Sequence, residues 1–317
     1  YYFDGGIRKD FQISSYDVDH PGWGCTPDKQ FATNAEYPHL LGEYVWTGFD
    51  YLGEPTPFNS DNTNLLNFRT NPSKKAELEK KLEELKRLQP PSRSSYFGIV
   101  DLAGFPKDRY YIYQAHWRPE LPMVHILPHW NWPDRTGKTV PVHVYTSGTE
   151  AELFLNNKSY GRKVKKEGKD FRLVWDNVVY EPGTVKVIAY KKGKVWAKDE
   201  IQTTTEASKI TSISDKQIIS NNGYEYAFIT VRIEDKSGNL VPTANHKLKI
   251  DVTGCGELVA TDNGDPTSFV PFQSNQREAF NGLALAIVKA KTGEKGNIKI
   301  KVDSPGLKPA QIQIRSK

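Results

Sequence analysis

Acidic and aromatic side chains stand close together in the first third of the chain, and in combination they could cleave a glycosidic bond. One carboxylic acid protonates the leaving oxygen, a second carboxylate attacks or stabilises the anomeric carbon, and an aromatic ring packs against the C–H face of the sugar. The acids that stand near aromatic residues are Asp17, Asp19, Glu43, Asp50, Glu54 and Asp101. Surface loops of many proteins carry such acids, so their density alone assigns none of them a catalytic role.

Other reaction classes lack their motifs in this sequence. His116, His125 and His129 have no HExxH context, and there is no GxSxG elbow or glycine-rich phosphate loop. We interpret these histidines as structural and expect no cofactor. The DNGD turn, Asp262–Asp265, could hold calcium, but it lacks the ligand spacing of a known calcium loop. A two-residue Asn-Gly hairpin is the favoured interpretation.

Composition and charge describe an ordinary multidomain protein. The chain has 317 residues, of which 37% are hydrophobic and 12% aromatic, enough for two or three domains. Its net charge of +5 is spread along the sequence, so no nucleic-acid partner is expected. No apolar run approaches the roughly 18 to 20 residues that cross a bilayer, so no membrane contact is expected. Cys25 and Cys255 lie far apart, and a disulfide between them is not expected.

The first segment has the element order of an α/β unit. Threonine, proline and aspartate at 26–28 predict a helix over Pro27–Glu36. A strand over Leu40–Trp46 then leads into an acidic and aromatic turn within GEYVWTGFDYLGEPTP (42–57). A second short strand is predicted over Tyr96–Leu102, and the run RYYIYQAHW predicts a second helix.

A charged segment at about 73–89 interrupts this order. Its apolar residues form one helical stripe, made of Leu78, Leu82, Leu85 and Leu88. A surface helix laid over the domain is the favoured interpretation, and a partner-binding helix is the alternative.

Beyond Pro133 the apolar residues recur at every second position, which is typical of β-strands. The first run of alternation predicts a β-unit over 137–205, with Asn156-Asn157 as a turn. A threonine-rich joint at Thr203–Thr205 leads to a second unit over 207–317. Each unit should fold by itself. The inward positions predicted for the second unit include Ile229, Val231, Ile233, Leu248, Ile250, Leu283, Leu285, Ile287, Ile298 and Ile300.

Five stretches together resemble the C-terminal half of bacterial β-galactosidases of glycoside hydrolase family 2. They are GEYVWTGFDYLGEPTPF, SRSSYFGIVDLAGFPKDRYYIYQAHW, HILPHWNWPDRTGKTVPVHVYTSGTEAELFLNNKSYG, ATDNGDPTSFVPF and REAFNGLALAIV. They cover nearly the whole chain in the order of that family. The charged helix at 73–89 departs from the resemblance and looks like an insertion.

The resemblance implies the C-terminal part of a catalytic (β/α)8 TIM barrel over 1–135, followed by two immunoglobulin-like β-sandwiches over 137–205 and 207–317. Such a barrel needs about 200 residues or more, so the barrel would be incomplete and the missing N-terminal half of the polypeptide would be its partner. Both catalytic glutamates would lie upstream of Tyr1. Glu43, inside the strand that resembles the eighth of the barrel, is not the nucleophile. No catalytic residue is therefore expected in this chain.

Substrate contact is what the resemblance carries over to this chain. Trp46 resembles a tryptophan at the end of the eighth strand that packs against the sugar in subsite −1, and Asp50 lies in the turn of the same motif. The alternatives are that Trp46 only packs the barrel and that Asp50 only caps backbone amides. Some members bind sodium through an asparagine before a glycine that matches Gly98. Phe97 stands there instead, so no metal is expected.

The expected function is that of a retaining exo-β-galactosidase acting on terminal β-D-galactosides in oligo- or polysaccharides. A β-glucuronidase or β-mannosidase of the same family is the alternative, as is a non-catalytic carbohydrate-binding or spacer module. Solvent-facing aromatic residues in a row on one sheet would favour binding; the candidates, which could equally be core, are Tyr160, Trp175, Tyr180 and Trp196.

Further expectations rest on the same reasoning. Trp130 and Trp132 are expected to wedge the barrel against the first sandwich. The resemblance implies a carbohydrate substrate as the partner and a periplasmic or secreted location, and it leaves a homo-oligomer open.

Overall fold

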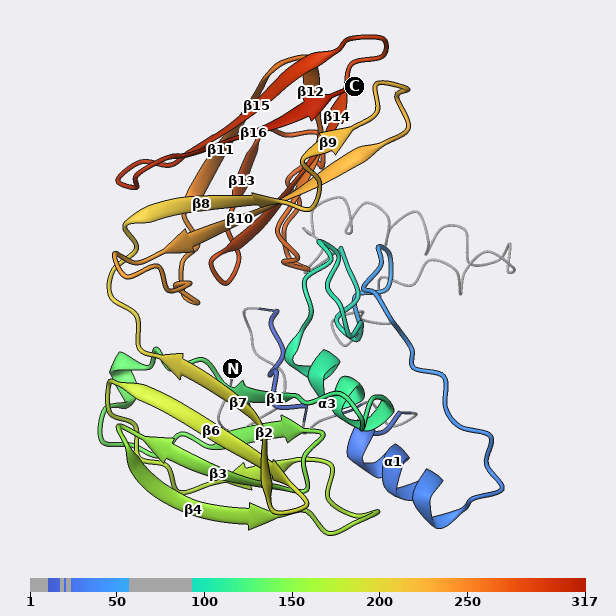
Figure 1. Cartoon of the computed structure of the whole chain (residues 1–317), viewed down its shortest axis with the longest axis vertical. Coiled ribbons are helices and arrows are strands. Elements are labelled where there is room, and N and C mark those ends of the chain that lie inside the picture. The colour runs from blue at the N-terminus through green and yellow to red at the C-terminus, as the bar shows by residue number, and fades with distance from the viewer. Residues whose placement is uncertain (1–10, 18–19, 21–23, 57–92) are drawn as a thin grey trace, which may run out of the picture.

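The computed structural model describes residues 11–17, 20, 24–56 and 93–317. They form two β lobes with an irregular segment and two helices beside them (Figure 1). The expected fold is confirmed in part: this is a mostly-β, multidomain chain with several antiparallel sandwich sheets. Asp19 and the predicted helix at 73–89 lie outside the described residues.

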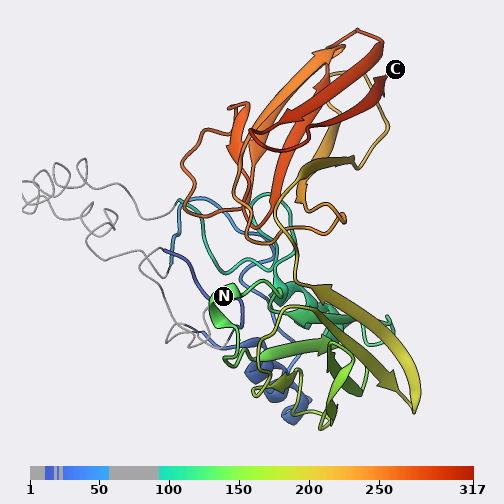
Figure 2. The same cartoon turned by 90° about the vertical axis from the view of Figure 1, so that its left-hand side faces the viewer.

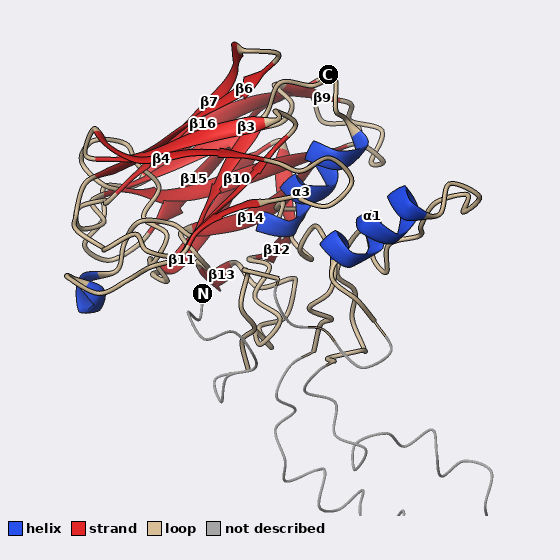
Figure 3. Ribbon diagram, turned by 90° about the horizontal axis from the view of Figure 1, so that it is seen from below, coloured by secondary structure: helices blue, strands red, loops and turns tan. Residues whose placement is uncertain are grey.

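Both predicted helices of the first segment are present. Helix α1 spans Pro27–Glu36, with Thr26 at the N-cap position, and helix α3 spans Asp108–Trp117. The two lie side by side (Figures 1 and 3) because Phe31 of α1 packs its ring 3.9 Å from His116 and 5.4 Å from Tyr113 of α3, measured between ring centroids.

The strands predicted at Leu40–Trp46 and Tyr96–Leu102 are not formed, so these two predictions are wrong. Within the described part of 24–118 the backbone has no regular strand, and no portion of a TIM barrel is evident there. A parallel strand needs continuous pairing with its neighbours. Here the isolated bridges lie beyond the first stretch: Phe49 pairs with Val100, and Leu52 pairs with Ser94.

The first lobe consists of two antiparallel sheets with orders β1-β2-β5 and β4-β3-β6-β7. Asn156 and Asn157 have φ angles of 49° and 66°, so they form the predicted two-residue turn between β3 and β4. The strands are β1 Val124–Leu127, β2 Val142–Thr146, β3 Glu150–Leu155, β4 Lys158–Val164, β5 Leu173–Trp175, β6 Thr184–Lys191 and β7 Lys194–Gln202, and a 3-10 turn, η4, spans Pro133–Arg135.

Trp130 belongs to the core of the first lobe rather than to a contact with a barrel. Its side chain is 1% exposed, and its Nε1 donates a hydrogen bond of 3.0 Å to the carbonyl oxygen of Glu181. Trp132 packs against the same core and stacks on His129 at 4.2 Å. Strand β1 also precedes the boundary expected near residue 137, and it pairs with β2 along its whole length.

The second lobe has sheets with orders β12-β14-β10-β8 and β13-β11-β15-β16-β9. The two sheets enclose one hydrophobic core. The strands are β8 Lys209–Ser214, β9 Ile218–Ile219, β10 Tyr226–Glu234, β11 Lys247–Gly254, β12 Gly256–Asp262, β13 Gln276–Glu278, β14 Leu283–Ala290, β15 Gly296–Asp303 and β16 Ala310–Ser316.

Strand β14 turns the opposite face to the core from the one predicted. Ala284, Ala286 and Val288 face the core, whereas Leu283 and Ile287 point outward. Because both faces of this strand are apolar, period-two alternation does not specify which face is buried, and a shift of one residue exchanges the two faces.

The Asn-Gly hairpin predicted at Asp262–Asp265 is also wrong. Strand β12 ends at Asp262, and the next strand, β13, lies in the other sheet. The side chains instead cap the loop: Asn263 Oδ1 accepts from the Asp265 amide at 3.1 Å, and Asp265 Oδ1 accepts from the Thr267 amide at 2.9 Å. No cluster of three or more potential metal ligands occurs among the described residues.

The joint at Thr203–Thr205 forms hydrogen bonds with both lobes. Thr203 Oγ1 donates to the carbonyl oxygen of Trp130 at 2.6 Å, and the Thr205 amide donates to Asp235 Oδ2 at 3.1 Å. Figure 2 shows the two lobes from the side, with the stretch that leads from residue 93 to helix α3 passing between them. In the described part of the chain, no helix is long and apolar enough to cross a membrane.

The role of β1 and Trp130 in the first lobe predicts a difference between two truncated chains. A chain of residues 120–317 should unfold cooperatively, whereas 138–317 should be less stable by about 3–5 kcal/mol or more, the usual cost of deleting one buried tryptophan side chain. Urea denaturation followed by circular dichroism measures both. Equal midpoints would contradict the assignment of β1 to this lobe.

Candidate functional site

Aromatic side chains gather at the turn that follows α1. The Trp46 side chain is 72% exposed, and its Nε1 donates a hydrogen bond of 3.0 Å to Tyr51 Oη. The Tyr51 hydroxyl in turn donates to the carboxylate of Glu54. The Tyr51 ring meets the Trp46 and Phe97 rings edge to face, at centroid distances of 6.4 Å and 5.7 Å. We call these four residues the aromatic turn.

The aromatic turn is suited to a sugar ring. An exposed indole offers an apolar face, while a phenol and a carboxylate beside it offer hydrogen bonds to hydroxyl groups. Sequence reasoning singled out Trp46 and, in the acidic and aromatic turn that follows it, Tyr51 and Glu54, but it missed Phe97 as a member. Phe97 comes from a distant stretch, so only the fold brings it here.

Asp50 lies beneath the aromatic turn, with only 5% of its surface exposed. Its Oδ1 accepts hydrogen bonds from the Gly98 amide at 2.7 Å and the Ser95 hydroxyl at 2.9 Å, and its Oδ2 forms an ion pair with Lys107. This is the geometry of an acid that caps backbone amides. The predicted contact of Asp50 with substrate stays a prediction.

Gly98 allows the two stretches to approach this closely. A Cβ atom at this position would overlap the backbone nitrogen of Asp50 and lie 2.6 Å from the carbonyl carbon of Phe49. A side chain here would therefore separate the aromatic turn from the segment that holds it.

Two further ionisable groups accompany Asp50. Burial lowers the pKa of Lys107, and the Asp50 carboxylate opposes that shift. Burial raises the pKa of Asp101 from 3.8 to about 7, although a hydrogen bond of 2.8 Å from the Phe105 amide favours its ionised form. The Asp101 carboxyl group lies directly against Gly264 of the second lobe.

Arg93 ties the aromatic turn to the second lobe. The Gly53 amide donates to the Arg93 carbonyl oxygen at 2.9 Å, and the Arg93 amide donates to that of Pro266 at 3.0 Å. The Arg93 guanidinium lies 4.4 Å above the Phe272 ring and 3.5 Å from the Asp262 carboxylate. The second lobe thus supports the turn from behind.

The remaining acids of the first segment lie elsewhere. Glu43 accepts a hydrogen bond of 3.2 Å from Trp117 Nε1, and burial raises its pKa. Asp17 forms an ion pair with Arg109. The fold therefore brings Asp50 and Asp101 together with Lys107 and leaves Glu54 in the aromatic turn. Glu43 and Asp17 each contact other residues instead.

The three histidines pack against aromatic rings. His116 stacks on Phe31, His129 stacks on Trp132, and His125 stacks on Tyr111 at a centroid distance of 3.8 Å. His125 Nε2 also lies 2.7 Å from Asp108 Oδ1.

The four aromatic residues considered as a glycan-binding row do not form one. Trp175 and Tyr180 are buried in the core of the first lobe. Trp196 donates to the Ser147 hydroxyl at 2.8 Å, and Tyr160 packs at the margin of that core.

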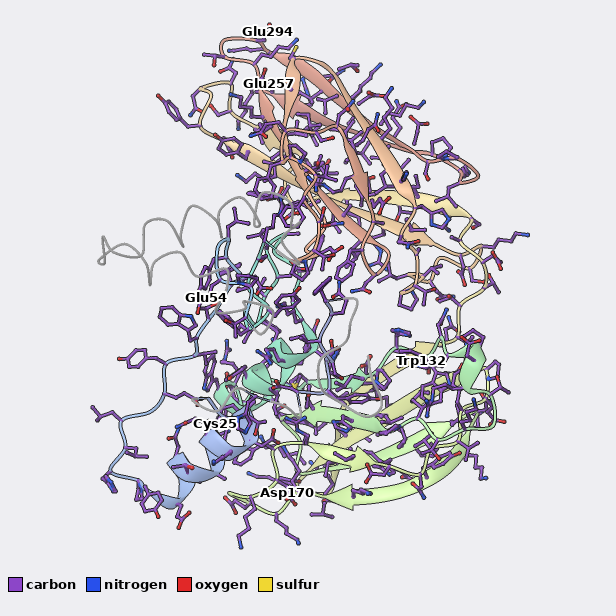
Figure 4. The ribbon with its side chains drawn as sticks, turned by 180° about the vertical axis from the view of Figure 1, so that it is seen from behind. Cys25, Glu54, Trp132, Asp170, Glu257 and Glu294 are labelled. Atoms are coloured by element: carbon purple, nitrogen blue, oxygen red, sulfur yellow. The ribbon has the colours of Figure 1, made fainter. Side chains whose placement is uncertain are left out.

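A cavity of about 370 Å³ lies between β11 and β12 of the second lobe. Glu257 lines it, and Figure 4 shows Glu257 in the second lobe, well away from Glu54 of the aromatic turn. This cavity does not belong to the aromatic turn.

Family models match both lobes. Residues 210–313 match "Glycoside hydrolase family 2 C-terminal domain 5", and residues 137–197 match a domain of unknown function, DUF4982. The first match covers nearly all of the second lobe.

Known proteins match almost the whole chain. A β-galactosidase of Bacteroides ovatus is 38% identical over 305 residues, which is 96% of this chain and 32% of the relative. A putative β-glucuronidase of Formosa agariphila is 30% identical, over 83% of this chain and 23% of the relative. The crystal structure of a β-glycosidase from Bacteroides vulgatus superposes with a TM-score of 0.80 at 31% identity, over 96% of this chain and 34% of that one. The chain thus spans about a third of the length of the first relative and of this structure.

The raised pKa of Asp101 predicts how stability changes with pH. Between its ordinary value of 3.8 and about 7, the folded chain holds a proton that the unfolded chain has released, so this group lowers stability as pH rises through that range. The Asp101→Asn variant should lose less stability between pH 4.5 and 7.5 than the parent, with the pH values chosen to bracket roughly this window. Urea unfolding at both pH values measures the change.

An exposed acid of the first lobe provides the control. Asp176→Asn should keep the pH dependence of the parent, because this side chain lies at the surface. If the Asp101→Asn and Asp176→Asn variants behaved alike, Asp101 would not be the titrating group.

Proposed function

We propose that this chain, which belongs to glycoside hydrolase family 2 and carries C-terminal domains of that family, is part of a retaining exo-β-galactosidase for terminal β-D-galactosides in oligo- or polysaccharides. The observation that carries the proposal is the exposed Trp46 ring, hydrogen-bonded to Tyr51 on a turn that Asp50 holds from below. The similarity to a β-galactosidase along 96% of the chain supports the choice of substrate.

In the complete protein, the first segment completes a (β/α)8 barrel and the aromatic turn lies at its mouth, where such barrels bind substrate. The general acid and the nucleophile come from the part of the polypeptide that this chain does not include. The reaction is a double displacement: the nucleophile forms a glycosyl-enzyme ester as the acid protonates the leaving oxygen, and water then hydrolyses the ester.

Trp46 packs against the C–H face of the galactosyl ring in this proposal. As the ring flattens toward an oxocarbenium ion, a flat indole face follows it into the transition state. Asp50 has a positioning role, because its carboxylate already accepts two hydrogen bonds and faces Lys107. Direct contact of Asp50 with the sugar would require it to leave that ion pair.

The charge of the aromatic turn favours a neutral sugar over a glucuronide. Glu54 lies beside Trp46 through its hydrogen bond with Tyr51, and its carboxylate would repel the carboxylate of a glucuronic acid. β-Mannosidase remains the alternative among neutral substrates. A periplasmic or secreted location is part of the proposal and rests on family resemblance.

The proposal predicts that the isolated chain of 317 residues is inactive. Because both catalytic carboxylates belong to the rest of the polypeptide, the purified chain should release no nitrophenol from an aryl β-galactoside above the uncatalysed rate. Turnover by the chain alone would place a catalytic acid within it.

The full-length enzyme should depend on Trp46. Trp46→Ala removes an aromatic contact of about 1–3 kcal/mol, so kcat/KM for an aryl β-galactoside should fall about ten- to a hundredfold. Part of this loss should appear in kcat, because the indole contact tightens as the sugar ring flattens in the transition state, and the rest in KM.

The matched control is Val195→Ala, an exposed apolar side chain on β7 of the first lobe. It should leave kcat/KM unchanged. A folded Trp46→Ala enzyme as active as the parent would reduce Trp46 to a packing role and remove the proposed site.

A further inference from the structure

Three aromatic side chains line one face of the second lobe. Tyr224, Tyr226 and Phe228 are 85%, 37% and 44% exposed, while the intervening Ala227 is buried. Tyr226 and Phe228 lie on β10, and Tyr224 continues their alternation just before it. Because alternate residues of a strand point to the same side, the three rings form one row about 13 Å long. We call these residues the aromatic row.

The sheet surrounds the aromatic row with apolar and then charged side chains. Ile287 of β14 lies opposite Phe228, and Lys289 lies opposite Tyr226. Lys289 Nζ forms an ion pair of 3.1 Å with Glu257 of the edge strand β12. The apolar strip is therefore narrow, and hydrogen-bonding groups flank it.

We propose that the aromatic row is a non-catalytic binding site for a neutral β-linked glycan. Aromatic rings pack on the apolar C–H faces of pyranose rings, and a linear row matches an extended polymer. The tyrosine hydroxyls and the Lys289–Glu257 pair supply donors and acceptors for sugar hydroxyls. An exposed apolar surface rimmed by polar groups is typical of a binding site.

The dimensions of the aromatic row favour a glycan over a protein partner. A stable protein interface covers about 800 Å² on each side and has a broad apolar centre. The row is one aromatic side chain wide, with Ile287 of β14 and Ile213 of β8 near its Phe228 end and a charged pair at its flank. The aromatic row also extends along β10 away from Thr230. Thr230 lies at the same level of the sheet as Asp262, which forms an ion pair with Arg93.

The aromatic row and the aromatic turn are separate sites with separate residues. A polymer held on the row would raise the local concentration of chain ends near the active site. The proposal needs membership of a glycan-cleaving family but no particular reaction at Trp46, so the two proposals fail independently.

Affinity electrophoresis of the full chain tests the aromatic row. Native gels contain hydroxyethyl cellulose or β-1,4-galactan as neutral β-linked probes, and pullulan as an α-linked reference. The parent should be retarded by a β-linked polymer but not by pullulan. Tyr226→Ala combined with Phe228→Ala should raise the Kd about tenfold or more, that is by about 1.4 kcal/mol or more.

Two variants serve as controls. Ile218→Ala removes an exposed apolar side chain from β9 in the opposite sheet and should keep full retardation. Val195→Ala, on β7 of the first lobe, should also keep it, because that side chain lies outside both the aromatic row and the aromatic turn. Circular dichroism checks that every variant is folded.

Two results would overturn the proposal. One is equal mobility of the parent in gels with and without both β-linked polymers. The other is a dimer in analytical ultracentrifugation that the double variant abolishes without any retardation of the parent, which would make the aromatic row an interface between copies.

Discussion

The buried carboxylate of Asp50 is the interaction on which the candidate site depends. It joins the turn at 46–54 to the stretch at 95–107 through Gly98, Ser95 and Lys107. Hydrogen bonds to an ionised, buried acceptor are stronger than neutral ones, whereas a buried charge left without its partner costs about 3–5 kcal/mol. Regular strand pairing is absent from this described segment. A few side-chain contacts therefore hold its stretches together, as strand pairing does in the lobes.

Support for this cluster comes from residues far away in sequence. The Asp101 carboxyl group lies against Gly264, and Arg93 makes an ion pair, a ring contact and a backbone hydrogen bond with the second lobe. The second lobe is therefore more than a spacer: it forms one wall of the packing beneath Trp46. A substitution in the loop at 263–275 would reach the aromatic turn through Arg93, since Gly53 is hydrogen-bonded to the Arg93 carbonyl oxygen.

Local signals explain what could be predicted from the sequence. The proline and acid at the start of α1, the Asn156-Asn157 turn and the alternation in the lobes each act within a few residues. The prediction of a strand at Leu40–Trp46 was wrong because a strand is stabilised by pairing with neighbouring strands, which short-range sequence patterns do not reveal. The partners of Asp50 and the approach of Phe97 to Tyr51 were equally inaccessible, since contacts across more than 40 positions join them. The face of β14 was ambiguous because both of its faces are apolar.

On a strand, an aromatic residue that alternates in step with the buried aliphatic residues packs in the core, whereas one that alternates out of step is available for binding. This distinction was present in the sequence. Trp175 alternates in step with Leu173, so both enter the core of the first lobe. Tyr226 and Phe228 are out of step with Ile229 and Val231, which occupy the core of the second lobe. Aromatic side chains in that phase must point away from the core. A count of aromatic residues on a strand therefore says little, whereas their register against the buried aliphatic positions identifies those that face solvent.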